Sequence, residues 1–360
     1  MACPKVGVIG LGRFGINHLR CYRQLSWLGL VELVAACDVN EELLEARMRE
    51  FHFTPYTDYK EMLENEELNA VSVATPDHLH RQIVIDCIEA GVNVLCEKPL
   101  DVTVDGCIEM VEAARRKNVL LCVDFHKRYD EYHQLLKRKI EAGELGKIQY
   151  GYAYMEDRLE VPRDWLRKWA HMTSPAWFLG IHYYDLVRWL LQSNATEVWA
   201  KGKKEKLVAM GIDTYDSITA MVCFENGATV CFQTCWILPD EFEATVNQGL
   251  RLIGTSGIAE CDAQDRGTRT CCETDSPKQQ SHNPAYLRLR YDAFGREWWE
   301  GYGIASIADF AQIVSMMLDG AKISEIKGVF ATGEDGLEAT RIAQAIHESA
   351  ESGTIVKIER

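Results

Sequence analysis

Apolar and polar positions follow two rhythms in the first third of the chain. Short, continuous apolar runs are typical of strands that are buried on both faces of a sheet, whereas apolar positions that recur every three or four residues predict helices. The two kinds of segment alternate, which predicts a parallel sheet covered by helices on both faces. We expect strands at residues 5–9, 31–37, 70–74, 92–96 and 119–123, and helices at residues 14–25, 41–51, 80–90 and 104–117.

The rhythm changes after about residue 129, where the pattern predicts a different kind of domain. Turns such as Glu225-Asn226-Gly227 separate the later strand-like runs and favour hairpins of an antiparallel sheet. The polar, irregular stretch 264–299 is too long for a structureless connection, so we expect a lid or a binding loop there. The remaining expected elements are helices at 129–141, 180–191, 306–318 and 334–351, strands at 148–156, 216–224, 229–236, 244–254 and 258–262, and a short final strand.

Composition narrows the class of protein. The 360 residues are enough for two domains, and a net charge of −15 without a basic patch argues against a nucleic acid or an anionic membrane as partner. The 13 cysteines are scattered without a metal-knuckle spacing, so we expect reduced thiols, no metal site and a cytoplasmic protein. We recognise no signal peptide and no apolar run of membrane-spanning length.

The stretch VGVIGLGRFGINHLR joins the first expected strand to the first expected helix through three glycines. In this strand–turn–helix context the spacing predicts a phosphate cradle. Gly10 permits the tight turn, Gly12 lets the backbone approach a pyrophosphate, and Gly15 lets helix and strand pack closely. The free N–H groups at the helix N-terminus favour the same anion.

Asp38 ends the second expected strand and indicates which cofactor is bound. A carboxylate at this position accepts hydrogen bonds from the ribose hydroxyls of the adenosine half and repels a 2′-phosphate, which favours NAD over NADP. Arg13 either contacts the pyrophosphate or is a solvated side chain at a helix start, and Phe14 beside it is a further candidate contact. We therefore expect a domain that binds NAD.

Lys98 follows another buried strand, in the stretch VNVLCEKPL. Ligands of such folds bind at the carboxyl edge of the sheet. Pro99 favours an extended backbone before it, which aims the ammonium group of Lys98 instead of joining it to the next helix. The alternative interpretation is a charged pair of Glu97 and Lys98, solvated at a strand end.

His182 lies near the start of the expected helix in WFLGIHYYDLVRWLL, with Asp185 on the same face. Oxidation of an alcohol needs a base with a pKa near 7, which takes the hydroxyl proton as the hydride leaves. A histidine beside a nicotinamide site meets that need. The alternative is an ordinary structural histidine, satisfied in the core or on the surface.

Together these segments resemble the Gfo/Idh/MocA family of nicotinamide-dependent oxidoreductases, which act mostly on sugars, inositols and their derivatives. The resemblance covers nearly the whole chain. Besides the glycine loop, its motifs are VATPDHLH (73–80), EKP (97–99), VDFHKRYD (123–130), GIHYYDLVRW (180–189), LIGTSGIAE (252–260) and GEDGLEATRIAQAIHESAESG (333–353).

The resemblance implies an α/β fold with a Rossmann domain first and an α+β domain with a large open, mainly antiparallel sheet after it. It also implies that the last helix packs back onto the first domain, and that a homodimer or homotetramer forms through the exposed sheet face. We expect the Rossmann domain over residues 1–125, the substrate-binding and oligomerisation domain over 126–332, and the C-terminal helix and strand over 333–360.

The resemblance assigns roles to single residues as well. Lys98 matches the lysine that orients and polarises the reacting hydroxyl near the nicotinamide, and His182 matches the catalytic histidine. The other matched residues are Thr75, Pro76 and His80 near the cofactor ribose, Glu97 at the nicotinamide ribose, and Arg128 at a position that often lines the cleft.

The sequence departs from the family pattern at Phe178, because many members place an aspartate four residues before the histidine. Either Asp185 or another group then orients His182, or the substrate presents an apolar part at Phe178. The tryptophans of the preceding segment either stack on a pyranose ring or belong to the core. The further candidates for substrate contact are Arg163, Trp165 and Tyr183.

These residues predict an enzyme that transfers a hydride between NAD and a ring hydroxyl, or ketone, of a sugar, glycoside or cyclitol. Because Phe178 and the tryptophans suit an apolar substituent, 3-oxidation of a glycoside is the finer hypothesis. The alternatives are an inositol dehydrogenase, a glycosidase with tightly bound NAD, and a non-catalytic NAD-binding regulator, and the missing aspartate is the best support for the regulator.

Overall fold

The computed structural model describes residues 2–262, 267–272, 275 and 277–359. The chain divides into two compact units, which are described separately. The first unit comprises Met1–Tyr129 and Tyr286–Leu337, and the second comprises Asp130–Ala285 and Glu338–Arg360. The domain bounds expected from the sequence remain a prediction beside this division, which groups the segment 286–337 with the first unit because its helix packs on the parallel sheet.

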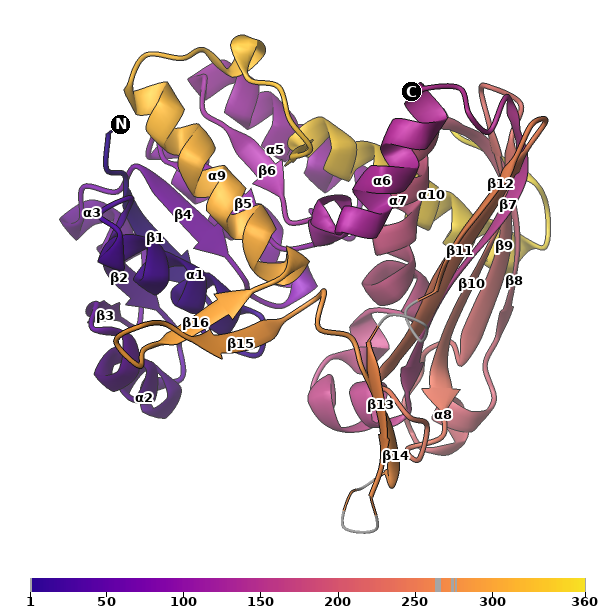
Figure 1. Ribbon diagram of the computed structural model, residues 1–360, viewed down its shortest axis with the longest axis horizontal. Coiled ribbons are helices and arrows are strands. Elements are labelled where there is room, and N and C mark those ends of the chain that lie inside the picture. Colours follow the sequence, from indigo (N-terminus) through magenta and orange to yellow (C-terminus); the bar gives the residue numbers. More distant parts are fainter. Residues whose placement is uncertain (1, 263–266, 273–274, 276, 360) are drawn as a thin grey trace. The chain divides into compact units, whose positions relative to one another are not determined.

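The first unit is built on a seven-stranded sheet with the order β17-β6-β5-β4-β1-β2-β3 (Figure 1). Six strands are parallel, and only β17 runs antiparallel to its neighbour among the described strands of this sheet. The strand order reverses between β1 and β4, which makes the carboxyl edge there the point where ligands bind in such sheets. The strands are β1 (Lys5–Ile9), β2 (Glu32–Cys37), β3 (Thr54–Tyr56), β4 (Ala70–Val73), β5 (Asn93–Cys96), β6 (Leu121–Val123) and β17 (Ala331–Thr332).

Helices pack in two groups around this sheet. One group joins α1 with α2 and α9, and the other joins α4 with α3 and α5. Leu19 and Tyr22 of α1 and Phe310 of α9 are almost fully buried in one hydrophobic core with the strands. The helices are α1 (Gly15–Trp27), α2 (Glu41–Phe51), α3 (Tyr59–Asn65), α4 (His80–Glu89), α5 (Val104–Lys117) and α9 (Tyr302–Leu318), with short 3₁₀ turns η1 (Asp77–Leu79), η2 (His126–Tyr129) and η6 (Ile323–Glu325).

Local chemistry explains where these helices begin and end. The Asn40 side chain accepts a hydrogen bond from Leu43 N at 3.1 Å, and the Thr103 hydroxyl accepts one from Gly106 N at 3.1 Å, so α2 and α5 each begin at a side-chain cap. Helix α5 ends at Asn118 in the left-handed region, with φ of 54°. The helix bounds therefore follow from residues close to them in sequence.

The second unit contains a seven-stranded sheet with the order β12-β11-β7-β10-β9-β8-β18 (Figure 1). Its described pairings are antiparallel except that of β7 with β10, which confirms the expected mainly antiparallel sheet. The strands are β7 (Ile148–Arg158), β8 (Ala195–Lys203), β9 (Ser217–Phe224), β10 (Thr229–Leu238), β11 (Val246–Gly254), β12 (Ile258–Asp262) and β18 (Val356–Lys357).

Several helical segments of the second unit pack on this sheet, and a π-helical turn leads into one of these helices. Helix α7 contacts β7, and the turn η5 just before it contacts β7 and β10. The alternation along β7 buries Ala153 and Met155 and exposes Tyr152. The helices are α6 (Glu131–Glu141), α7 (Ile181–Leu191), α8 (Lys206–Ala209) and α10 (Gly333–Ser352), with the turns η3 (Val161–Trp165), η4 (Ala170–Met172) and η5 (Ala176–Gly180). Helix α10 belongs to the first unit up to Leu337 and to the second unit from Glu338.

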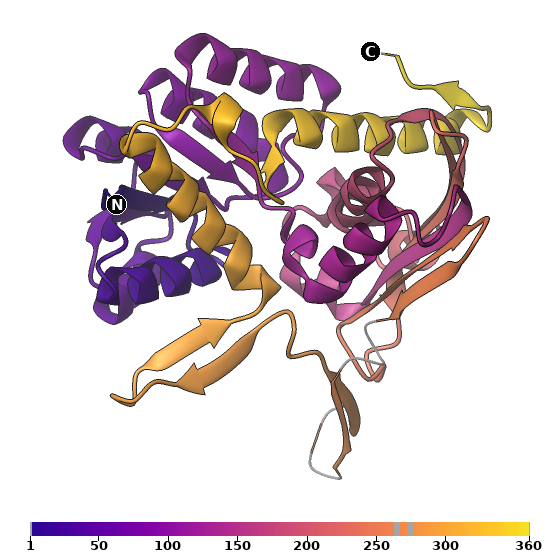
Figure 2. The same cartoon turned by 45° about the horizontal axis from the view of Figure 1, so that its top comes forward.

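The stretch 264–299, which looked irregular in the sequence, contains two hairpins in its described residues (Figure 2), and its expected role as a lid or a binding loop stays a prediction. One pairs β13 (Thr268–Cys271) with β14 (Gln279–His282), and the other pairs β15 (Arg288–Tyr291) with β16 (Glu297–Glu300). Residues 263–266, 273–274 and 276 lie outside the described residues. Long-range contacts hold the second hairpin: Trp299 exchanges two hydrogen bonds with the Gln24 side chain, at 2.8 and 2.9 Å, and its ring lies 3.7 Å from the Arg20 guanidinium.

Candidate active site and cofactor cradle

The glycine loop between β1 and α1 leaves room for a ligand at one position and fills the others. Gly10 has φ of +88°, and a side chain on it would meet the Ala74 carbonyl oxygen at 2.5 Å. A side chain on Gly15 would collide with the Gly10 carbonyl oxygen. A Cβ on Gly12 would meet no other heavy atom within 4 Å in the described part of the chain. The loop is thus tightly packed at Gly10 and Gly15 and open at Gly12, and the cofactor roles assigned to these glycines stay predictions.

A cavity of about 660 Å³ lies beside this loop, at the carboxyl edge of the first unit's sheet. Predicted cofactor residues in its wall are Gly10, Gly12, Asp38, Thr75 and Pro76. Thr57, Asp58, Tyr59, His78 and Gln82 also line it, and sequence reasoning missed these. The only sequence signal for these residues was their place after β3 and β4. The short strand β3 has no clear apolar pattern, so the signal after it was not recognised.

The atoms around this cavity fit a dinucleotide. Asp38 Oδ2 accepts a hydrogen bond from Leu11 N at 2.8 Å, and Oδ1 accepts one from Asn40 N at 2.9 Å. A carboxylate has further lone pairs, so hydroxyl groups can still donate to it. The Thr75 hydroxyl is buried and has no hydrogen-bond partner among the described residues, as expected of a group that awaits a ligand.

His80 holds the neighbouring loops together. Its ring is fully buried, with Nδ1 2.8 Å from the Pro99 carbonyl oxygen and Nε2 2.9 Å from the Thr75 carbonyl oxygen. His80 therefore fixes both the loop after β4 and the loop that follows Lys98. The expectation that His80 lies near the cofactor ribose stays a prediction. The structure shows that both ring nitrogens of His80 contact backbone carbonyl oxygens of these two loops.

Lys98 and Glu97 follow β5 at the same edge of the sheet. Lys98 is 4% exposed, and its ammonium nitrogen lies 5.5 Å from the centroid of the Phe14 ring. Its backbone N–H donates to Glu97 Oε2 at 3.3 Å. The pair is therefore buried and packed against the glycine loop, and the alternative of a solvated pair at a strand end is wrong. Arg13, by contrast, is exposed.

The structure engages Arg128 within the first unit. Its guanidinium donates to the Phe330 carbonyl oxygen at 3.1 Å and pairs with Asp335 at 3.2 Å, and the residue is 3% exposed. These contacts link η2 to the segment that starts α10. The role of Arg128 at the substrate stays a prediction, and the structure gives the side chain a clear part in the fold.

In the second unit, His182 occupies the first turn of α7, directly after the π-helical turn η5. Such turns are rare and occur frequently at functional sites. His182, Tyr183 and Asp185 are all buried. Phe178 is also buried, and its ring packs 6.2 Å from Trp169 and 5.9 Å from Trp236.

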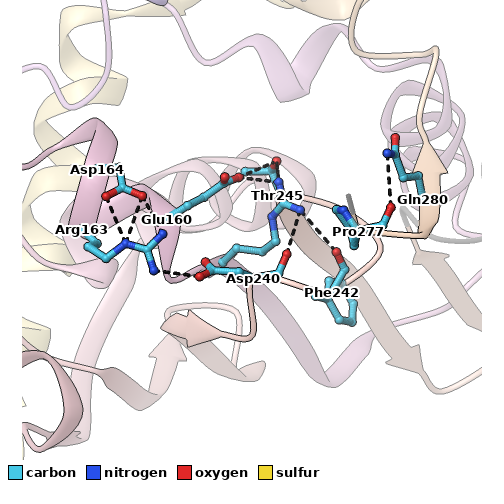
Figure 3. A network of polar contacts seen from close by, with 9 residues as sticks. Glu160, Arg163, Asp164, Asp240, Phe242, Thr245, Pro277 and Gln280 are labelled. Carbon is cyan, nitrogen blue, oxygen red and sulfur yellow. Dashed lines mark hydrogen bonds and ion pairs between the residues drawn. The ribbon is translucent and has the colours of Figure 1, made fainter. Parts of the chain in front are cut away.

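Arg163, in η3 with Trp165 at its end, binds two carboxylates (Figure 3). It donates to Asp164 at 2.6 Å and to Asp240 at 2.7 Å, and these hydrogen bonds raise its pKa. Two residues labelled in Figure 3, Glu160 and Thr245, contact a second arginine: Arg158 pairs with Glu160 and donates to the Thr245 hydroxyl at 3.0 Å. A role for Arg163 at the substrate stays a prediction, because a substrate would have to compete with Asp164 and Asp240 for the guanidinium.

Sequence reasoning missed one cluster of titratable groups in the first unit. His18 of α1, Glu97 after β5 and Asp124 after β6 bring their side-chain atoms within 4.8 Å of one another. Only Glu97 had been singled out, because the other two residues come from distant segments. The positive charge of Lys98 acts on both acids and disfavours a bound cation there.

No helix in the described part of the chain combines the length and the apolar character that crossing a membrane requires.

Comparison with known proteins places this architecture. The model for the oxidoreductase family with an NAD-binding Rossmann fold, GFO_IDH_MocA, matches residues 4–125, and the model for the GFO/IDH/MocA C-terminal domain matches residues 133–260. Together the two models span more than half of the chain. The predicted Rossmann domain and the resemblance are thereby confirmed.

Curated relatives and solved structures agree with this. The chain is 25% identical to myo-inositol 2-dehydrogenase of Thermotoga maritima, over 99% of this chain and 98% of that protein. It is 26% identical to levoglucosan dehydrogenase of Pseudarthrobacter phenanthrenivorans, over 96% of each. Its fold is similar to that of scyllo-inositol dehydrogenase from Lactobacillus casei, solved with bound NAD(H) and scyllo-inositol, with a TM-score of 0.78, 19% identity and 99% coverage of both chains.

The open glycine cradle, the acid at the end of β2 and both domain matches lead to one conclusion. The chain belongs to the Gfo/Idh/MocA family of oxidoreductases, and its Rossmann domain binds NAD.

Proposed function

We propose that this protein is a dehydrogenase that transfers a hydride between NAD and a ring hydroxyl, or the corresponding ketone, of a sugar, glycoside or cyclitol. The observation that carries the proposal is the placement of Lys98, buried at the carboxyl edge of the same sheet as the glycine cradle and packed on Phe14. The relatives named as dehydrogenases of myo-inositol and levoglucosan support the substrate class.

The proposal gives two residues separate tasks. His182 takes the hydroxyl proton when the substrate is oxidised, and Lys98 stabilises the negative charge that develops on the oxygen. NAD, when bound, supplies the hydride acceptor. Burial of both side chains favours these tasks, because electrostatic interactions are stronger away from water.

As a finer proposal, the ring position is carbon 3 of a glycoside or anhydrosugar. Two observations support a glycoside or anhydrosugar as the substrate: a levoglucosan dehydrogenase is among the relatives, and Phe178 stands where many family members have an aspartate that suits a polyhydroxylated ring. An inositol dehydrogenase is the second candidate, which the myo-inositol 2-dehydrogenase of Thermotoga maritima favours.

The test follows absorbance of reduced nicotinamide while the protein and NAD meet a panel of glycosides, anhydrosugars, free sugars and cyclitols. We expect reduction with one class only, and a loss of about a hundredfold or more in Lys98→Ala and His182→Ala. Both variants should still bind NADH. Matched controls are Lys139→Ala and His171→Ala, which alter a half-buried lysine that pairs with Glu144 and an exposed histidine, both of the second unit, and should keep full activity.

Two results would contradict the proposal. If the protein binds NADH but reduces NAD with no compound of the panel, the result would favour a non-catalytic NAD-binding regulator. Full activity in Lys98→Ala or His182→Ala would remove the assigned roles. Reduction only with cyclitols would keep the dehydrogenase and replace the glycoside by an inositol.

A further inference from the structure

Three buried titratable side chains, one of them from the residue before Lys98, lie in contact with one another. His18 Nε2 lies 3.3 Å from Glu97 Oε1 and 3.9 Å from Asp124 Oδ2. All three residues belong to the first unit and are at most 7% exposed. Glu97 also accepts the backbone N–H of Lys98, so the cluster is joined directly to the proposed catalytic lysine.

The cluster is incompletely satisfied by hydrogen bonds. Among the described residues, His18 Nδ1 and Asp124 Oδ1 have no hydrogen-bond partner. Two carboxylates that share a site away from water cannot both carry a full negative charge without cost. The geometry therefore favours a state in which His18, Glu97 and Asp124 share a proton.

Charge and burial indicate which acid holds that proton. Burial, followed by the charge of Glu97, raises the pKa of Asp124 to about 7, although His18, Ser306 and Lys98 oppose the rise. Burial would raise the pKa of Glu97 as well, but its hydrogen bond to His18 and the charges of His18, Lys98 and His126 hold it below the usual value. Glu97 therefore stays ionised while Asp124 gains or loses the proton near neutral pH.

Further titratable side chains surround this cluster and influence the pKa values of its members. Asp77 is a further buried acid, and its pKa is raised by burial and lowered by the charges of Lys98 and His80. It is thus the natural control for an effect attributed to Asp124. The titratable or charged side chains that face the cluster are Cys21, Tyr22, Asp77, Lys98, His126, Tyr129 and Tyr286, together with the Ser306 hydroxyl.

The cluster lies on the side of the sheet towards which a dinucleotide extends. The cavity beside the glycine loop is lined by residues that follow β1, β2, β3 and β4. A dinucleotide in such a sheet crosses the point where the strand order reverses, which here leads from β1 to β4 and on to β5. Glu97 and Asp124 follow β5 and β6 at that edge.

We propose that His18, Glu97 and Asp124 form a proton-sharing cluster that releases a proton to the solvent when oxidised cofactor binds, and that it thereby sets the balance between NAD and NADH. The oxidised nicotinamide ring is positively charged and the reduced ring is neutral. An ionised Asp124 adds one negative charge to the site, so it favours NAD over NADH. By linkage, a ligand that prefers the ionised form drives the proton off.

Calorimetry with the cofactor alone tests the proposal. NAD is titrated into the protein at about pH 6, 7 and 8, in pairs of buffers whose ionisation enthalpies differ, and NADH is the matched ligand. We expect proton release with NAD that is largest near pH 7, and little release with NADH. The affinity for NAD relative to NADH should rise by about tenfold from the lowest to the highest pH.

Two variants should separate Asp124 from its neighbours. Asp124→Asn is isosteric and permanently neutral, so it should release no proton and keep at every pH the affinity ratio that the natural protein shows at low pH. Asp77→Asn should keep both effects. His18→Gln should shift proton release to higher pH, because His18 lowers the pKa of Asp124.

Three results would overturn the proposal: undiminished proton release in Asp124→Asn, its disappearance in Asp77→Asn, or a stoichiometric metal ion in the purified protein that Asp124→Asn lacks. Melting temperature and NADH binding at low pH show that each variant is folded. The test needs no substrate, so it gives its answer even where the proposed sugar or cyclitol chemistry fails.

Discussion

Leu11 donates its backbone N–H to Asp38 Oδ2 at 2.8 Å, which ties the glycine loop to the acid at the end of β2. Asp38 thereby has two tasks in one side chain. It holds the loop that is predicted to receive the pyrophosphate, and it lines the cavity in which the adenosine ribose is expected.

Substitution of Asp38 should separate these tasks. In Asp38→Ala both are lost, and we expect the affinity for NAD to fall by about ten- to a hundredfold, as for the loss of charged hydrogen bonds. Asp38→Asn keeps an acceptor for Leu11 and removes the charge, so binding of NADP should improve relative to NAD. Fluorescence titration with NADH and NADPH measures both effects, and an unchanged preference in Asp38→Asn would contradict the assignment.

The glycines of the loop give a matched pair. Gly12→Ala should leave the melting temperature of the cofactor-free protein nearly unchanged, because its Cβ enters open space, and should weaken NAD binding. Gly15→Ala should lower the melting temperature, because its Cβ collides with the Gly10 carbonyl oxygen. Thermal unfolding with and without NAD distinguishes them. A Gly12→Ala variant that binds NAD normally would mean that the pyrophosphate does not approach this position.

Phe178→Asp restores the residue type of many family members, and we expect it to destabilise the second unit. The ring packs against Trp169 and Trp236, so the substitution removes apolar contacts and buries a charge, at a cost of about 3–5 kcal/mol. Phe178→Leu keeps an apolar side chain and should cost about 1 kcal/mol. Urea denaturation measures both. An unchanged free energy of unfolding in Phe178→Asp would show that the contacts with Trp169 and Trp236 do not hold this part of the second unit.

His347 should make stability depend on pH. Its Nε2 lies 2.9 Å from the Ser174 hydroxyl oxygen and its ring stacks 5.5 Å from Trp177. Burial lowers the pKa of His347 below its usual value, so the unfolded chain binds a proton before the folded one. The stability that the neutral His347 ring contributes is therefore complete at pH values above the ordinary histidine pKa of about 6.5. It is lost as the pH falls through the lowered pKa of the folded protein.

The measurement for His347 is the melting temperature as pH is lowered from about 7 to 5. His347→Gln cannot take up a proton at this position, so its melting temperature should fall less than that of the natural protein. Parallel curves for the two proteins would show that His347 contributes nothing to acid destabilisation.

Much of the first unit could be predicted because its signals are local. The strand, the glycine loop, α1 and Asp38 follow one another within a short stretch, and each residue's role depends on near neighbours. The helix α5 was predicted with its observed bounds, since Thr103 and Asn118 cap it. The short edge strand β3 and the strand β8 escaped notice, because neither shows a distinct apolar run.

The sequence by itself determined the two kinds of domain, the cradle for NAD and the family, since periodicity and short motifs report on burial and turn geometry. Only the tertiary structure decided which distant side chains meet. Arg163 donates a hydrogen bond to Asp240, and the Arg20 guanidinium stacks over the Trp299 ring. His18 contacts Glu97, which lies 79 residues away in the sequence. Such meetings depend on strand order and on the packing of helices across a sheet, and local pattern does not encode either.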